Sequence, residues 1–204
     1  MFTGIVSGIG QITHVEPLGV SDQDGVRLFV QANNFDMSRV KLGDSIAIQG
    51  ACMTVVAFDE HSFQVDVSRE SLNKTSGLNK QGEVNLEHAM RLSDTVDGHL
   101  VSGHVDGLGE VVHFSPVGES MLLSIQLPKE LAPYMAYKGS ITVNGVSLTV
   151  NHVEDNTQGC IVSINLIPHT VEVTTLKHLK EGSLVNIEID TIARYVERML
   201  KLKT

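Results

Sequence analysis

The sequence predicts an all-β protein with a C-terminal helix, built as two tandem, homologous, six-stranded antiparallel closed β-barrels. Two observations lead to this fold class. The chain repeats itself at an offset of 95 to 101 residues, and each repeat consists of short segments in which apolar and polar residues alternate. A period of that length is domain-sized, because solenoid repeats span only about 20–50 residues. A chain of 204 residues has room for two such domains and a tail.

The repeat is clearest in one phrase. Residues 42–55, LGDSIAIQGACMTV, align without gaps with residues 137–150, YKGSITVNGVSLTV. Three further pairs of segments match in the same order along the chain. They are residues 2–10 with 101–109, residues 66–75 with 165–174, and residues 82–87 with 182–188. Four matches in one order predict two homologous domains, residues 1–97 and residues 98–188, followed by a tail over residues 189–204.

Each predicted domain contains six segments that are rich in β-branched residues, separated by clusters of Gly, Asp, Asn and Pro. Six short antiparallel strands in about 90 residues favour a small closed barrel, which leaves no exposed strand edge. Short helices are expected within residues 35–40 and 129–139. The predicted strands cover residues 10–17, 26–32, 45–50, 52–58, 62–68 and 83–87, and then residues 109–114, 121–127, 140–145, 147–153, 160–167 and 184–189.

The tail has a different pattern. Its apolar residues follow 3-4-3 spacing, which predicts one amphipathic helix; they are Ile189, Ile192, Val196 and Met199. Such a helix either folds back onto its own barrel or projects and associates with copies of itself in a short coiled coil. The pattern leaves both alternatives open.

Composition excludes several classes of function. The formal charge of −9 and the absence of a basic run argue against a nucleic-acid surface. Cys52 and Cys160 fit no disulfide framework, and no Cys/His/carboxylate cluster has the spacing of a metal site. The N-terminus is not a signal peptide, and no apolar run approaches the roughly 18 residues of a membrane span. We therefore expect a soluble, cytoplasmic protein without nucleic-acid or membrane partners.

The repeated phrase also carries candidate ligand-binding residues. Cys52 and Thr54 are two apart on a predicted strand and so share a face, as do Ser147 and Thr149 in the second domain. Each pair follows a glycine, where backbone can approach a ligand closely. A thiol and hydroxyls beside free backbone groups could bind a flat polar heterocycle. The alternative is that these β-favouring residues simply form the barrel wall.

Two titratable residues interrupt the repeat. His104 aligns with Ile5, and Lys138 aligns with Gly43. A histidine of near-neutral pKa suits proton transfer, and a lysine beside a pocket could hold an anionic substrate. The alternatives are a surface histidine and a solvated loop lysine. Phe2 gives the chain an apolar start that could cap a barrel.

Several phrases together resemble the riboflavin synthases of the α-chain type: MFTGIV at the start, QGACMTV, NGVSLTV, GHLVSGHVDG and LIPHT…TTL. The resemblance covers the whole chain, including the tail. It implies two six-stranded barrels and a C-terminal helix, assembled as a homotrimer held largely by those helices. The implied reaction converts two molecules of 6,7-dimethyl-8-ribityllumazine into riboflavin and 5-amino-6-(D-ribitylamino)uracil by transfer of a four-carbon unit. It implies no metal or redox cofactor.

The resemblance also implies site residues, with the active site formed between the N-barrel of one subunit and the C-barrel of a neighbour. The implied N-barrel pocket comprises Gly4, Ile5, Val6, Cys52, Met53, Thr54, Asp66, Val67, Ser68, Arg69, Glu70 and Ser71. The implied C-barrel pocket comprises Gly103, His104, Val105, Lys138, Ser147, Leu148, Thr149, Asn165, Leu166, Ile167, Pro168, His169 and Thr170. The candidates for the chemistry are His104, Ser147, Cys52 and Ser45, with Phe2 helping to close the pocket.

One alternative belongs to another class of protein. Lumazine proteins share this fold and hold a single flavin-like ligand without turnover. Both half-site phrases and His104 are intact here, which favours the enzyme. Two positions depart from many relatives, Gln49 in place of Asn and Asp97 in place of Gly; Gln49 could shift a turn. The sequence leaves open which barrel holds the donor and whether the protein associates with the lumazine-producing enzyme.

Overall fold

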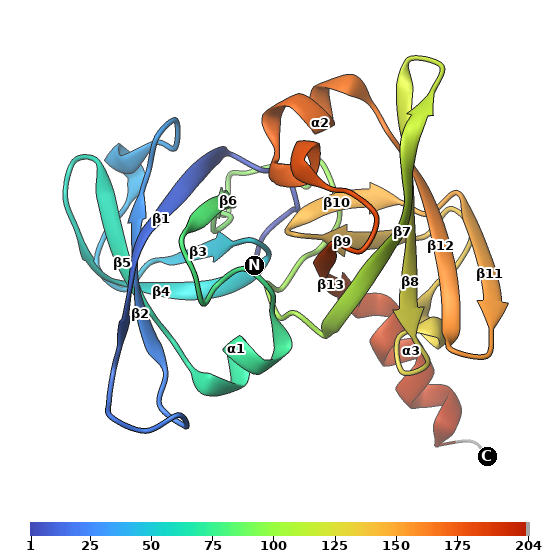
Figure 1. The fold of residues 1–204 in the computed structure, drawn as a ribbon, viewed down its shortest axis with the longest axis horizontal. Coiled ribbons are helices and arrows are strands. Elements are labelled where there is room, and N and C mark those ends of the chain that lie inside the picture. Colours follow the sequence, from blue (N-terminus) through green and yellow to red (C-terminus); the bar gives the residue numbers. More distant parts are fainter. Residues whose placement is uncertain (203–204) are drawn as a thin grey trace.

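The computed structural model describes residues 1–202 as two β-rich halves that lie side by side, with a helix at the C-terminus (Figure 1). The first half is a closed barrel with the strand order β1-β2-β5-β4-β3-β6, in which all neighbours are antiparallel. Its strands are β1 (Gly8–Pro17), β2 (Val26–Gln31), β3 (Ser45–Ile48), β4 (Ala51–Phe58), β5 (Ser62–Val67) and β6 (Gly82–His88). All six strands predicted in this half are confirmed.

Alternation along β4 shows why this segment is a barrel strand. Ala51, Met53 and Val55 point inward and are buried in the first hydrophobic core. Cys52 and Thr54 lie on the opposite face and are partly or largely exposed. The period of two therefore places the candidate ligand-binding residues outside the barrel, on the face that meets the rest of the chain.

The second half is a curled sheet of seven strands with the order β10-β9-β13-β7-β8-β12-β11. It encloses a second core of similar size, which includes Leu123, Ile125 and Ile187. The strands are β7 (Gly107–Val117), β8 (Ser120–Pro128), β9 (Ser140–Val143), β10 (Val146–Thr149), β11 (His152–Asn156), β12 (Gly159–Leu166) and β13 (Leu184–Ile189).

The second half differs in one respect from the predicted closed, six-stranded barrel: it is an open sheet of seven strands. The single strand expected over residues 147–153 is divided into β10 and β11, so the ladder opens between them. Around the break, the Val150 N–H donates to the Gly139 carbonyl (2.9 Å) and the Asn151 N–H to the Ser163 carbonyl (2.8 Å). The chain thus changes its hydrogen-bond partner from one neighbouring strand to the other. In β4 the same change is absorbed by a bulge between Val55 and Ala57.

Both expected short helices are single 3₁₀ turns, η1 (Met37–Arg39) and η2 (Ala132–Tyr134). Three further short helices are present that the sequence did not predict: α1 (Arg69–Lys74), α2 (Pro168–Val173) and the 3₁₀ turn η3 (Thr175–His178). Their start signals were present: the Ser68 hydroxyl accepts from the Ser71 N–H (3.1 Å), and Pro168 occupies the first turn of α2. One turn and a half of helix is too short for a periodic apolar pattern to reveal it.

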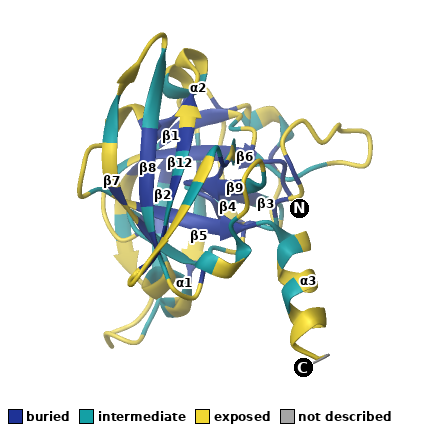
Figure 2. Cartoon of the chain, turned by 90° about the vertical axis from the view of Figure 1, so that its right-hand side faces the viewer, coloured by how far each residue is buried: buried dark blue, intermediate teal, exposed yellow. Residues whose placement is uncertain are grey.

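The tail forms α3 (Thr191–Lys201), which begins with an Asp190 cap. Ile189 does not belong to its apolar stripe, because it is a buried residue of β13. The rest of the stripe is open to solvent: Ile192 is 62% exposed, Val196 49% and Met199 61%. The structure therefore favours the projecting alternative, and Figure 2 shows α3 extending away from the two sheets.

A charged anchor fixes the start of α3. The Arg194 guanidinium donates to the Asp106 carboxylate (2.6 Å), and the other oxygen of Asp106 accepts from the Ile189 N–H (2.9 Å).

Within residues 1–202, no helix is both long and apolar enough to cross a membrane.

Candidate functional site

The two halves meet at a short antiparallel bridge near the N-terminus. The Phe2 N–H donates to the Val101 carbonyl (2.7 Å), and the Val101 N–H donates to the Phe2 carbonyl (3.0 Å). These two residues are equivalent in the repeat, at the offset of 99. A pseudo-two-fold axis therefore passes between them, and the segments that follow run in opposite directions across the interface.

Each of these segments, residues 3–6 and 102–105, crosses to the other half. The Cys52 N–H of the first half donates to the Gly103 carbonyl (2.7 Å), and the Ser147 N–H of the second half donates to the Gly4 carbonyl (2.7 Å). Both glycines have positive φ, +76° and +78°. A β-carbon on Gly4 would lie 2.6 Å from the Ser147 side chain, and one on Gly103 would lie 2.7 Å from the Cys52 side chain. Only glycine fits at either crossing.

This exchange corrects the grouping drawn from the sequence. Gly4, Ile5 and Val6 do not lie with Cys52, and Gly103, His104 and Val105 do not lie with Ser147. Val105 packs against the first core and Val6 against the second. The repeat could not reveal the exchange, because two equivalent segments align equally well whichever half they pack against.

Two buried carboxylates hold the crossing segments. Glu87 accepts from the Thr3 N–H (2.7 Å), the Thr3 hydroxyl (2.9 Å) and the Gly4 N–H (3.0 Å). Glu188 accepts in the same way from the Ser102 N–H (2.7 Å), the Ser102 hydroxyl (2.6 Å) and the Gly103 N–H (2.9 Å). Burial raises the pKa of both carboxyls, although these hydrogen bonds oppose the shift.

Two asparagines join the turns at the far end of the interface. The Asn85 side chain donates to the Asn144 carbonyl (2.8 Å), and the Asn186 side chain donates to the Gln49 carbonyl (2.9 Å). Gln49 also accepts from the Asn85 N–H (2.9 Å), as Asn144 does from the Asn186 N–H (2.8 Å). Their φ angles are 50° and 49°. The glutamine therefore keeps the turn that an asparagine forms in the second half.

The first half-site is a cavity of about 210 Å³ between β4, α1 and the crossing segment. It brings Cys52 and Met53 together with His104, which the sequence analysis had assigned to different pockets. The full lining is Ala51, Cys52, Met53, Glu70, Ser71, Lys74, Thr75, Gly103, His104 and Val105. A thiol, a histidine and the polar side of α1 thus face one space.

Other predicted residues of this half have structural roles. Asp66 forms an ion pair with Arg27 (2.7 Å), whose hydrogen bond lowers the pKa of the Asp66 carboxyl. Val67 is buried in the barrel core, and the Arg69 guanidinium donates to a backbone carbonyl (2.7 Å). Of the predicted segment 66–71, Glu70 and Ser71 are the residues that line the cavity.

The second half-site is the equivalent arrangement of β10, α2 and residues 4–6. Leu148, Val6 and Val171 pack against the second core beneath it, and Leu166 is fully part of that core. Ile5 and Ile167 leave apolar surface open at this place, with 47% and 58% of each residue exposed. Thr149, Asn165, Pro168 and His169 are also exposed, and Thr170 is half-buried.

The two half-sites differ chemically behind their central residues. The Ser147 hydroxyl lies 2.7 Å from His99 Nδ1, and His99 Nε2 lies 3.3 Å from the Thr142 hydroxyl. In the first half, Thr142 and Ser147 are replaced by Ala47 and Cys52, which form an apolar cluster with Phe2 and Val101. Burial lowers the pKa of His99, which keeps its imidazole neutral.

His99 is the site residue that sequence reasoning missed. No counterpart precedes Phe2, so the repeat gives no signal for it, although the pairing of Thr142 with Ala47 shows that one half is more polar. Lys138 is exposed, and its ammonium donates to Asn151 Oδ1 (3.0 Å). Ser45 pairs with Thr54 across β3 and β4 and does not line the first half-site.

Within residues 1–202, no group of three or more His, Cys, Asp or Glu side chains is arranged to hold a metal ion. Both cysteines are free thiols. Phe2 is fully buried at the bridge, so its ring contributes to the wall behind Cys52.

A family model for the lumazine binding domain matches this chain twice, over residues 3–89 and 102–190. Riboflavin synthase from Photobacterium phosphoreum is 42% identical over 202 residues, covering 98% of this chain and 89% of the relative. Riboflavin synthase from Brucella abortus (strain 2308) is 41% identical, with 98% of each chain covered. The chain belongs to the riboflavin synthase family.

That family consists of enzymes, and its fold extends to a solved relative. A crystal structure of LumP complexed with 6,7-dimethyl-8-(1'-D-ribityl) lumazine matches with a TM-score of 0.78 at 25% identity, covering 93% of this chain and 99% of that one. Riboflavin synthase membership, the lumazine-binding repeats and the mostly β fold were all expected from the sequence, and all are confirmed.

The buried carboxylates make the interface sensitive to pH. Because the pKa of Glu87 and Glu188 is raised above the ordinary 4.5 in the folded protein, the folded state binds their protons more tightly than the unfolded state does. The two carboxyls contribute fully to the free energy of unfolding below their ordinary pKa. This contribution is lost as the pH rises through their raised pKa values. We expect the free energy of unfolding of the wild type, minus that of the double variant Glu87→Gln/Glu188→Gln, to fall as the pH rises above the ordinary carboxyl pKa of 4.5. Urea unfolding at several pH values measures this difference; a constant or rising difference would contradict it.

Proposed function

We propose that this protein is a riboflavin synthase that converts two molecules of 6,7-dimethyl-8-ribityllumazine into riboflavin and 5-amino-6-(D-ribitylamino)uracil. The observation that carries the proposal is the duplicated half-site, in which Cys52 and Ser147 occupy equivalent positions beside exchanged glycine segments. Two identical substrates need two similar pockets, and the repeat supplies them. The riboflavin synthase relatives support the assignment.

Orientation can supply much of the rate. Holding two rings in register makes a bimolecular step effectively unimolecular, and effective molarities of about 10⁵–10⁸ M are known for well-oriented pairs. The reaction also needs a proton removed from a ring methyl group and a polarising group at the other ring. We assign His104 to proton transfer, and Cys52 and Ser147 to contact with the two ring systems. We propose that Ser45 and Phe2 act from positions next to the first half-site. The hydrogen-bonded bridge between Phe2 and Val101 supports this role for Phe2.

The other predicted ligand contacts remain part of this proposal. We propose that the exposed and half-buried residues of the two predicted pockets bind the pyrimidine edge and the ribityl chain, while Asp66, Val67, Arg69 and Leu166 keep the structural roles described above. For the pocket of each half, the crossing segment comes from the other half: residues 103–105 beside Cys52, and residues 4–6 beside Ser147.

The domains proposed are residues 1–97 and 98–188. The free thiols Cys52 and Cys160 support a reducing, cytoplasmic location.

The activity is tested with 6,7-dimethyl-8-ribityllumazine as sole substrate, without metal or added cofactor. We expect riboflavin to appear at half the rate at which lumazine disappears. His104→Gln should lower kcat by a factor of about 10² or more, the usual contribution of a general acid–base group, with a smaller change in KM. His61→Gln, in the exposed turn between β4 and β5, is the matched control and should leave kcat unchanged.

The competing function is a non-catalytic binder, like the LumP relative that holds a ribityl lumazine. Tight binding of lumazine without turnover by the wild type would establish that function and contradict ours. Equal kcat in the His104→Gln and His61→Gln variants would remove His104 from proton transfer while leaving the dismutation itself in place.

We further propose a homotrimer in which α3 is the main contact and the N-barrel of one subunit faces the C-barrel of the next. The exposed stripe of Ile192, Val196 and Met199 supports self-association, since an unpartnered apolar stripe on a helix is usually buried by partner helices.

Light scattering tests this assembly. The wild type should have the mass of three 22.1 kDa chains. The variant Val196→Asp/Met199→Asp should dissociate, because aspartates cannot be buried in the seam between helices without a large desolvation cost. Arg198→Gln, on the same helix, should remain trimeric. An unchanged mass in the double variant would contradict the role of α3.

A further inference from the structure

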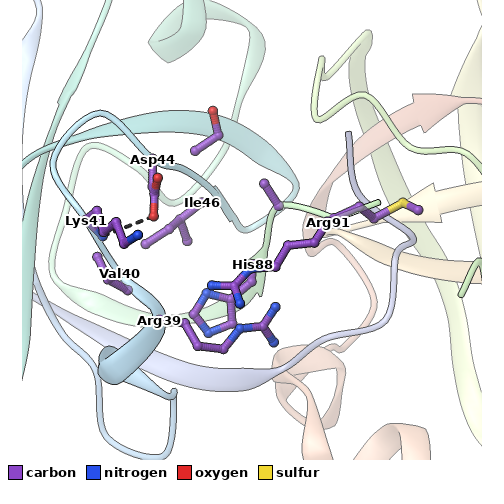
Figure 3. A pocket seen from close by; sticks show the side chains of 10 residues that line it. Arg39, Val40, Lys41, Asp44, Ile46, His88 and Arg91 are labelled. Carbon is purple, nitrogen blue, oxygen red and sulfur yellow. Dashed lines mark hydrogen bonds between the residues drawn. The ribbon is translucent and has the colours of Figure 1, made fainter. Parts of the chain in front are cut away.

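A cavity of about 340 Å³ lies in the first half of the chain (Figure 3) and shares no lining residue with the first half-site. Its wall comes from three segments: the turn after η1, the start of β3 and the chain that leaves β6. Arg39, His88 and Arg91 lie together on one side, with Lys41 and Asp44 on the other. The full lining is Arg39, Val40, Lys41, Asp44, Ser45, Ile46, His88, Ala89, Met90 and Arg91.

The charge of this cavity is opposite to that of the protein. The chain has a formal charge of −9, whereas the cavity wall carries three cations, Arg39, Lys41 and Arg91, against the single carboxylate of Asp44. That carboxylate is already engaged, because its Oδ2 accepts from the Lys41 backbone N–H (3.0 Å). A concentration of positive charge on an acidic protein favours binding of an anion.

Most of the cationic groups are available. Arg39 has one long ion pair, with Asp94 at 3.8 Å. Among residues 1–202, neither the Lys41 ammonium nor the Arg91 guanidinium has an ion-pair or side-chain hydrogen-bond partner, and both residues are exposed. Two guanidinium groups and an ammonium, contributed by the turn around η1 and by the chain after β6, can contact a small oxyanion from more than one side, and arginine matches phosphate oxygens with paired N–H donors.

His88 belongs to the same wall. Its ring stacks on Phe35 with centroids 3.9 Å apart, and its Nε2 is buried without a hydrogen-bond partner in the described chain. Burial, Arg39 and Arg91 lower the pKa of His88, so the ring stays neutral while the cations are unoccupied. Buried polar atoms are almost always paired, so the unpartnered Nε2 marks this wall of the cavity as incompletely satisfied within the described chain.

We propose that this cavity is a phosphate-binding site, with Arg39, Lys41 and Arg91 as the charged contacts. Two sources share this chemistry: inorganic phosphate, and the phosphate monoester at the end of a ribityl chain, as in flavin mononucleotide. Ser45 lines the cavity and is paired with Thr54 on the neighbouring strand β4. Thr54 lies two residues after Cys52, which lines the first half-site, so β4 connects the two places. Only the monoester source rests on the proposed function; the phosphate site itself does not.

Isothermal titration calorimetry with inorganic phosphate, in an anion-poor buffer, tests the site on the full chain. We expect binding to the wild type, and at least about tenfold weaker binding to Arg91→Gln and to Lys41→Gln, because each variant loses a charge-assisted contact to the anion. Lys129→Gln, which removes an exposed lysine next to η2, is the matched control and should bind as the wild type does. No detectable binding, or equal affinity in all four proteins, overturns the proposal.

Quenching of flavin fluorescence distinguishes the two sources. If the monoester is the ligand, flavin mononucleotide should bind more tightly than riboflavin to the wild type, and Arg91→Gln should abolish that preference. If both flavins bind alike while phosphate still binds, the site takes the free anion. Turnover of 6,7-dimethyl-8-ribityllumazine should be unchanged in Arg91→Gln, so a failure of the dismutation assay and a failure of the phosphate site are separately visible.

Discussion

The bridge between Phe2 and Val101 is the constraint on which the rest of the molecule depends. It is formed by two equivalent residues, so it defines the pseudo-two-fold axis and directs residues 3–6 and 102–105 into opposite halves. Glu87 and Glu188 then fix each crossing segment through three hydrogen bonds apiece. Each half-site is consequently complete only when the other half is folded against it. The duplicated chain therefore forms one interlocked structure and not two independent domains joined by a linker.

The exchange also explains how identical backbones acquire different chemistry. Behind Cys52 lies an apolar wall that includes the Phe2 ring, whereas behind Ser147 lies the neutral imidazole of His99, which is bonded in turn to Thr142. A dismutation requires its two substrate molecules to behave differently although they are the same compound. An interlocked pair of half-sites with unlike walls meets that requirement within one chain, and the symmetry is broken by residues near the axis.

The sequence predicted the duplication, the strands and the family correctly, because β-alternation and glycine turns are local signals. It missed α1 and α2, which are too short to show helical periodicity, and it missed the division of β10 from β11, where the chain changes its hydrogen-bond partner from one neighbouring strand to the other. It grouped His104 with Ser147 rather than Cys52, because a repeat shows equivalence and not contact. His99 had no counterpart to compare. Long-range pairing across an axis has no local signature, so these features required the structure.

Thiol labelling of Cys52 tests the exchanged half-sites most directly. Cys52 is half-buried in the first half-site, whereas Cys160 is fully buried, so the labelling rate of the accessible thiol reports on ligand in that half-site. Riboflavin should slow labelling in the wild type at a fixed, subsaturating concentration. His104→Ala should weaken this protection, because residue 104 borders the same cavity, whereas Ile5→Ala should preserve it. Loss of protection in Ile5→Ala with full protection in His104→Ala would contradict the exchange.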